Sequence, residues 1–147
     1  MFKKSVILAA AVLSSTQALA AYELNLSTAQ SSQDPMVKAM ENAAERIEER
    51  SEGEVTLNIF SSSQLGADND MIEQIRNGAN IAVLTDAGRL SEFQPELGIL
   101  AAPYLVESHE DYDRITSSEP YLEWVELLAE NTGMRLMNYN WFQGTRE

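Results

Sequence analysis

The sequence contains no cysteine, and this absence excludes disulfide bonds, thiolate nucleophiles and metal centres built on cysteine. Basic residues are also scarce, since ten Lys and Arg face 23 Asp and Glu over 147 residues and give a formal net charge of −13. A chain this acidic lacks the positive surface that supplies most of the affinity for nucleic acids, and the same sign disfavours docking on anionic lipid. The remaining composition, with 44% hydrophobic and 22% charged residues, is typical of a globular domain.

The first twenty residues have the three-part pattern of a secretory signal peptide. Lys3 and Lys4 supply its basic start, residues 5–13 form an almost uninterrupted apolar run, and the sequence Ala-Leu-Ala ends at Ala20, which predicts cleavage directly after it. This run is far shorter than the ~20 residues that span a bilayer, which favours a cleaved signal over a membrane anchor. We therefore expect a signal peptide over residues 1–20, export from the cytoplasm and no membrane insertion after cleavage.

From residue 21 onward, the chain alternates between strand and helix patterns. Polar and apolar side chains alternate over residues 22–27 and 54–59, which predicts two strands. The continuous apolar run at 81–84 predicts a third strand that is covered on both faces, as in a parallel sheet. Asp34 and the run 68–70 (Asp-Asn-Asp) are expected to cap helices between these strands, because apolar residues recur after them at helical spacing. The β-α-β-α-β order predicts an α/β fold with a sheet flanked by helices.

The second half of the chain has less regular patterns. Residues 97–106 are apolar but interrupted by Pro103, which favours a buried edge strand or a packed loop. Residues 108–111 (Ser-His-Glu-Asp) resemble a capping box and predict the start of a short helix. A longer helix is expected over 118–131, and residues 134–139 are expected to return as a strand.

No constellation in the sequence points to catalysis or to a bound metal. His109 has Ser108 and several acidic neighbours, but neighbours on one helix point in different directions and do not form a catalytic triad. The acidic run at 68–70 lacks the glycine and the terminal glutamate of a calcium-binding EF-hand loop. We therefore expect a protein that is not an enzyme and that holds no cofactor or metal.

Two arginines lie where an α/β sheet usually binds its ligand. Arg89 follows the third predicted strand and Arg146 follows the last one, and ligands of open α/β sheets bind outside the carboxyl ends of the strands. A guanidinium at that edge can hold a carboxylate in a two-pronged, charge-assisted hydrogen bond. The plain alternative is an ordinary surface ion pair, for example of Arg89 with Asp86 or Glu92.

Five short motifs, in order along the chain, carry a family resemblance. The run IFSSSQLG at 59–66, followed by an aspartate, resembles a strand-loop motif of the solute-binding proteins of tripartite ATP-independent periplasmic (TRAP) transporters. The sequences QIRNG at 74–78, FQPEL at 93–97 and APYL at 102–105 resemble further elements of that family. The sequence GTR at 144–146 resembles its motif at the first crossing between two lobes.

This resemblance implies a two-lobed periplasmic binding protein, of which residues 21–147 form the first α/β lobe. Ligand would be trapped between the lobes and delivered to an integral-membrane TRAP permease that is driven by an ion gradient. Ligands of the family are typically organic acids such as dicarboxylates, sugar acids and sialic acids. Members are about twice as long, so we expect the second lobe to be missing and the lone lobe to bind weakly or not at all. The alternatives are a two-lobed binding protein of another transporter class, for amino acids or oligopeptides, and a secreted enzyme.

The resemblance also implies which residues of the first lobe meet the ligand. Arg146 would bind a carboxylate, and Arg89 would assist it or orient Asp86. Asp68 and Asp86 would accept hydrogen bonds from hydroxyl or amino groups of the ligand, because an unpaired polar group in a closed site costs about 1–3 kcal/mol. The segment after the first strand would contribute its residues at 29 and 30 (Ala29 and Gln30).

Overall fold

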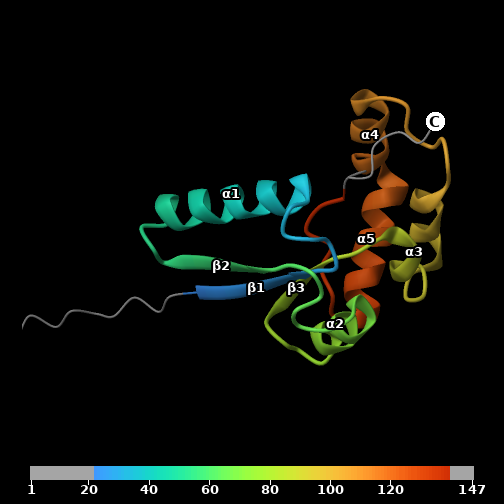
Figure 1. Cartoon of the computed structure of the whole chain (residues 1–147). Coiled ribbons are helices and arrows are strands. Elements are labelled where there is room, and N and C mark those ends of the chain that lie inside the picture. Colours follow the sequence, from blue (N-terminus) through green and yellow to red (C-terminus); the bar gives the residue numbers. More distant parts are fainter. Residues whose placement is uncertain (1–21, 140–147) are drawn as a thin grey trace, which may run out of the picture.

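The computed structural model describes residues 22–139 (Figure 1). The predicted signal peptide and the GTR motif at 144–146, which includes Arg146, therefore lie outside the described residues.

A three-stranded parallel sheet forms the first part of the fold and confirms the predicted α/β class. Its strands are β1 (Tyr22–Thr28), β2 (Val55–Phe60) and β3 (Ile81–Leu84), in the order β2-β1-β3. The strand β1 is therefore central, and its last two residues are buried. The strand β3 lies at an edge of these three strands, and its four residues are half-buried, which is less burial than its continuous apolar run predicted.

The first helix, α1 (Pro35–Arg50), begins and ends as its local sequence predicts. The carboxylate of Asp34 accepts a hydrogen bond of 2.8 Å from the Met36 N–H, and proline occupies the first turn. After the helix ends, Gly53 adopts a φ of +82°, a left-handed conformation that glycine reaches without strain. Val37 is fully buried, and α1 lies along β2 on one face of the sheet (Figure 1).

The second helix, α2 (Asp68–Arg76), is where predicted, but it is not capped by its acidic run. Ala67 occupies the N-cap position and makes no side-chain cap hydrogen bond, so Asp68 is the first residue of the helix. The prediction that the run at 68–70 supplies the cap is therefore wrong. Its acidic side chains still interact favourably with the positive end of the helix dipole.

The second half of the described chain is helical and forms the main core. It contains the short helix α3 (Ala87–Leu90), the 3₁₀ helix η1 (Pro95–Ala101), α4 (His109–Thr116) and α5 (Glu119–Thr132). Of the two alternatives for residues 97–106, the edge strand is wrong: the segment consists of η1, which buries Leu97 and Leu100, and the non-strand chain after it. Side chains from α2, α3, η1 and α5, together with Met134 after α5, pack into one buried cluster: Ile72, Ala87, Leu90, Leu97, Leu100, Tyr121, Leu128 and Met134.

Both predicted helices in this half are confirmed. The Ser108 hydroxyl accepts a hydrogen bond from the Asp111 N–H at the start of α4, and Ser118 makes the same kind of contact at the start of α5. The helix α5 ends at Gly133, which has a φ of +76°. None of the helices between residues 22 and 139 is long and apolar enough to cross a membrane.

The prediction of a strand at 134–139 is wrong. Met134 is buried in the core, but the segment pairs with none of the three strands of the sheet. Its end is instead tied down by Tyr139, whose hydroxyl donates a 2.9 Å hydrogen bond to the carbonyl of Leu100. Burial raises the pKa of Tyr139 to about 12, so this donor keeps its proton at neutral pH. The hydroxyl of Tyr112 also donates to the Tyr139 carbonyl, so the segment is held by packing and by hydrogen bonds at both its backbone and its side chain.

Candidate functional site

The carboxyl ends of the three strands lie at one edge of the sheet, because the strands are parallel. The chain after β1 carries Ala29 and Gln30, the chain before α2 leads to Asp68, and the chain after β3 leads to Asp86 and α3. Three polar side chains at this edge have a buried oxygen without a hydrogen-bond partner within residues 22–139: Ser27, Thr85 and Asp68. Buried polar atoms are normally paired, so this edge has unused hydrogen-bonding capacity.

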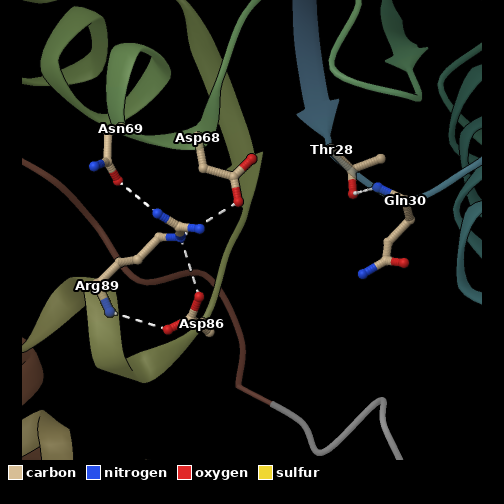
Figure 2. A network of polar contacts seen from close by, with 6 residues as sticks. All are labelled: Thr28, Gln30, Asp68, Asn69, Asp86 and Arg89. Carbon is tan, nitrogen blue, oxygen red and sulfur yellow. Dashed lines mark hydrogen bonds and ion pairs between the residues drawn. The ribbon is translucent and has the colours of Figure 1, made fainter.

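A cluster centred on Arg89 occupies this edge (Figure 2). The guanidinium Nε of Arg89 lies 3.1 Å from a carboxylate oxygen of Asp86 and 3.6 Å from Oδ2 of Asp68. Its Nη1 donates a 2.8 Å hydrogen bond to Oδ1 of Asn69. Asp86 also caps α3, since its Oδ1 accepts a 3.0 Å hydrogen bond from the backbone N–H of Arg89. The structure thus brings together three of the predicted site residues, Asp68, Asp86 and Arg89.

The Arg89 cluster has a surplus of negative charge. Two carboxylates face one guanidinium, and the side chain of Asp68 is only 11% exposed, whereas that of Asp86 is 54% exposed. Burial raises the pKa of Asp68; the Arg89 charge opposes this and the Asp86 charge adds to it. Oδ1 of Asp68 is buried and accepts no hydrogen bond from the described residues. This oxygen is therefore free to accept one further hydrogen bond.

The Ala29–Gln30 segment forms a second part of the edge, held by the loop after β2. The N–H of Ser62 donates to the Gln30 carbonyl at 2.7 Å, and the N–H of Ser63 donates to the Thr28 carbonyl at 3.0 Å. The Gln30 N–H in turn donates to the Thr28 hydroxyl at 3.2 Å. Ser62 and Ser63 have φ values of +54° and +55°, a left-handed conformation that is strained for serine. This strain is maintained by the two hydrogen bonds that fix the segment.

The two parts of the edge are distinct. Figure 2 shows Thr28 and Gln30 beside β1, apart from the Arg89 cluster, and no hydrogen bond or ion pair joins Gln30 to the three clustered site residues. Ala29 is exposed and Gln30 is half-buried. The sixth predicted site residue, Arg146, lies outside the described residues. The plain alternative of an ion pair between Arg89 and Asp86 is also confirmed, since the same contact belongs to the cluster.

Sequence reasoning missed the contact between Asn69 and Arg89. Asn69 is 20 residues from Arg89, and its neighbours suggested only a helix cap. A shallow groove of about 240 Å³ adjoins this contact. Its lining consists of Asn69, Ile72, Glu73, Arg89, Glu92 and Phe93. No group of acidic or histidine side chains within residues 22–139 has an arrangement that could hold a metal ion.

Comparison with known proteins shows the family of the chain. The family described as Bacterial extracellular solute-binding protein, family 7 matches residues 26–147. A solute-binding protein of Chromohalobacter salexigens is 31% identical over 108 residues, which is 74% of this chain and 31% of that protein. The sialic acid-binding periplasmic protein SiaP of Vibrio cholerae is 27% identical over 104 residues, 71% of this chain and 32% of that protein.

Solved structures agree with the sequence comparison. A TRAP periplasmic solute-binding protein of Escherichia fergusonii, in an open form without ligand, is 34% identical to this chain with a TM-score of 0.75. The match covers 82% of this chain and 40% of the E. fergusonii chain. A second, from Ochrobacterium anthropi with bound L-fuconate, has a TM-score of 0.71 and 29% identity and covers 76% of this chain and 37% of its own. The chain thus spans about a third of the length of the curated relatives it matches. On the family match over residues 26–147, the chain belongs to the bacterial extracellular solute-binding proteins of family 7, the binding proteins of TRAP transporters.

Proposed function

We propose that this protein captures a small organic acid in the periplasm and delivers it to an ion-gradient-driven TRAP permease. The observation that carries the proposal is the Arg89 cluster at the carboxyl edge of the sheet, where a buried oxygen of Asp68 has no hydrogen-bond partner among residues 22–139. Family membership supplies the transport role. The proposal includes cleavage of residues 1–20 as a signal peptide and a first lobe formed by residues 21–147. In the two-lobed architecture of the family, a second lobe completes the site, because closure of two lobes buries the ligand.

A polyhydroxy acid fits this site best. Two related structures contain L-fuconate and L-galactonate, at 29% and 31% identity, and a third relative is named for sialic acid. Each of these ligands has one carboxylate and several hydroxyl groups. In our assignment, Asp68 and Asp86 accept hydrogen bonds from the hydroxyls, and Arg89 orients the two carboxylates between them. Ala29 and Gln30 contact the ligand from the end of β1.

The ligand carboxylate needs a different partner. The Arg89 cluster has a net negative charge, and residues 21–147 as a whole carry eight basic and 23 acidic residues, a net charge of −15. This field repels an organic anion, so capture depends on local positive groups. We assign the carboxylate to Arg146, and we expect further basic groups from the second lobe to assist it.

Thermal-shift screening of the full gene product tests the proposal. The panel contains aldonic acids, sialic acid, dicarboxylates, keto acids and amino acids; the amino acids are included because the Arg89 cluster would also accept an ammonium group. We expect a polyhydroxy acid to give the largest rise in melting temperature. Arg146→Ala should abolish that rise, whereas Arg114→Ala, at an exposed arginine on α4, should retain it. A shift given only by amino acids, or one that Arg146→Ala leaves unchanged, would refute the assignment.

A further inference from the structure

We infer that Asn69 is a positioning residue of the ligand site. Its side chain holds the Arg89 guanidinium between Asp68 and Asp86 and away from Glu92. This inference rests on the proposed function, because it concerns the same site. Asn69 would not touch the ligand, but would act through the orientation of Arg89.

The first support is the geometry of the contact. Arg89 lies on α3 and Asn69 on the first turn of α2, so their 2.8 Å hydrogen bond joins two separate elements across the candidate site (Figure 2). It is shorter than the 3.1 Å and 3.6 Å separations between Nε and the two aspartates. A hydrogen bond from a charged donor is stronger than one between neutral groups. Asn69 therefore fixes the end of the guanidinium that the aspartates do not hold.

The second support is a competing acid beside Arg89. Glu92 lines the same shallow groove as Arg89 and Asn69 and has no ion-pair partner within the described residues. It follows Arg89 by three residues, in the turn after the end of α3, and the Glu92 N–H donates to the Arg89 carbonyl at 3.3 Å. Side chains three residues apart on a helical turn are neighbours. Glu92 thus offers an acidic side chain beside the same groove, and the structure shows the Arg89 guanidinium on Asp68 and Asp86 instead.

Together these observations assign a role to the amide of Asn69. A neutral acceptor holds the guanidinium without adding a third negative charge to a cluster that already has two carboxylates for one arginine. Without this acceptor, the Arg89 side chain would populate two conformations, one paired with the aspartates and one paired with Glu92. The two aspartates would then lose their fixed arrangement, and ligand affinity would fall.

The inference is tested by ligand titration of four variants of the full gene product, with the acid that gives the largest thermal shift as the probe. Asn69→Leu, which keeps the shape of the side chain and removes the acceptor, should weaken binding about 5- to 10-fold, the equivalent of about 1–1.4 kcal/mol for one charge-assisted hydrogen bond. Glu92→Gln alone is the reference for the rescue, because it removes one negative charge from the surroundings of a site that binds an anion. The double variant Asn69→Leu/Glu92→Gln should recover most of the loss, because the competing acid is gone. Asn42→Leu, the same change at an exposed position of α1, is the matched control.

A double-mutant cycle separates positioning from a structural effect on α2. In an Arg89→Leu background, Asn69→Leu should weaken binding no further, because the group that it positions is absent. A full additional loss in that background, or a failure of Glu92→Gln to rescue, overturns the inference. Wild-type binding that Asn69→Leu leaves unchanged overturns it while the proposed function stands. Absence of acid binding by the wild-type protein overturns the proposed function and this inference with it.

Discussion

The buried carboxylate of Asp68 should destabilise the protein in the absence of ligand. Its side chain is 11% exposed, and Oδ1 has no hydrogen-bond partner among residues 22–139. A buried polar atom without a partner costs about 1–3 kcal/mol, and more when it is charged. The ion pair with Arg89, at 3.6 Å and partly exposed, stabilises the folded protein by about 0–1 kcal/mol. We therefore expect Asp68→Asn to raise the free energy of unfolding by about 1 kcal/mol at pH 7 and to weaken ligand binding.

The pH dependence of this effect has a definite sign. The pKa of Asp68 is raised in the folded protein, chiefly by burial, so the unfolded chain releases this proton at a lower pH than the folded protein does. Below the ordinary pKa of aspartate, the group is protonated in both states and costs nothing. As pH rises through the raised folded pKa, ionisation increasingly favours the unfolded chain. The advantage of Asp68→Asn over wild type should therefore be small near pH 4 and grow towards pH 7.

Urea unfolding at several pH values between 4 and 7 measures this difference. Asp70→Asn is the matched control, because Asp70 lies on the same first turn of α2 but is exposed. It should lose only the favourable interaction with the helix dipole, about 0.3–1 kcal/mol, and should show no gain towards neutral pH. A lower stability of Asp68→Asn at pH 7, or an advantage that shrinks as pH rises, would refute the reasoning.

Three further predictions concern the scaffold and are measured by urea unfolding at pH 7. Tyr139→Phe should lower the free energy of unfolding by about 1 kcal/mol, because it leaves the buried Leu100 carbonyl of η1 without this donor. Tyr22→Phe, at a tyrosine that is 72% exposed, should change it little, and equal effects would contradict the prediction. Leu97→Ala should cost about 2–5 kcal/mol, because Leu97 is fully buried, and Leu122→Ala, at 55% exposure, should cost far less. Ser62→Gly should raise stability by about 0.5–1 kcal/mol by relieving a left-handed φ of +54°, and a loss would show that the backbone there is unstrained.

The sequence predicted best those features that depend on neighbouring residues. The caps at Asp34, Ser108 and Ser118 each join a side chain to an N–H two or three residues later. Such contacts follow from local chemistry, so the helix starts could be predicted without knowledge of the fold. The ion pair between Asp86 and Arg89 was predictable for the same reason, since three residues separate its partners.

Features that depend on distant parts of the chain could not be predicted in this way. An alternating or apolar segment becomes a strand only where another strand is available to pair with it, and residues 134–139 pack against the core instead. The edge position of β3 is likewise set by pairing with β1 and by no property of its own four residues. The contact of Asn69 with Arg89 joins α2 to α3, and only the folded chain brings them together.

Calorimetric titration of the full gene product with a polyhydroxy carboxylic acid tests the central claim most directly. The acid selected by the thermal-shift panel is compared with its amide, which keeps every hydroxyl group and lacks the charge. Our account predicts saturable binding of the acid at one site, loss of that binding in Arg146→Ala, and much weaker binding of the amide. Equal affinity for acid and amide, or no measurable heat with any acid of the panel, would contradict it.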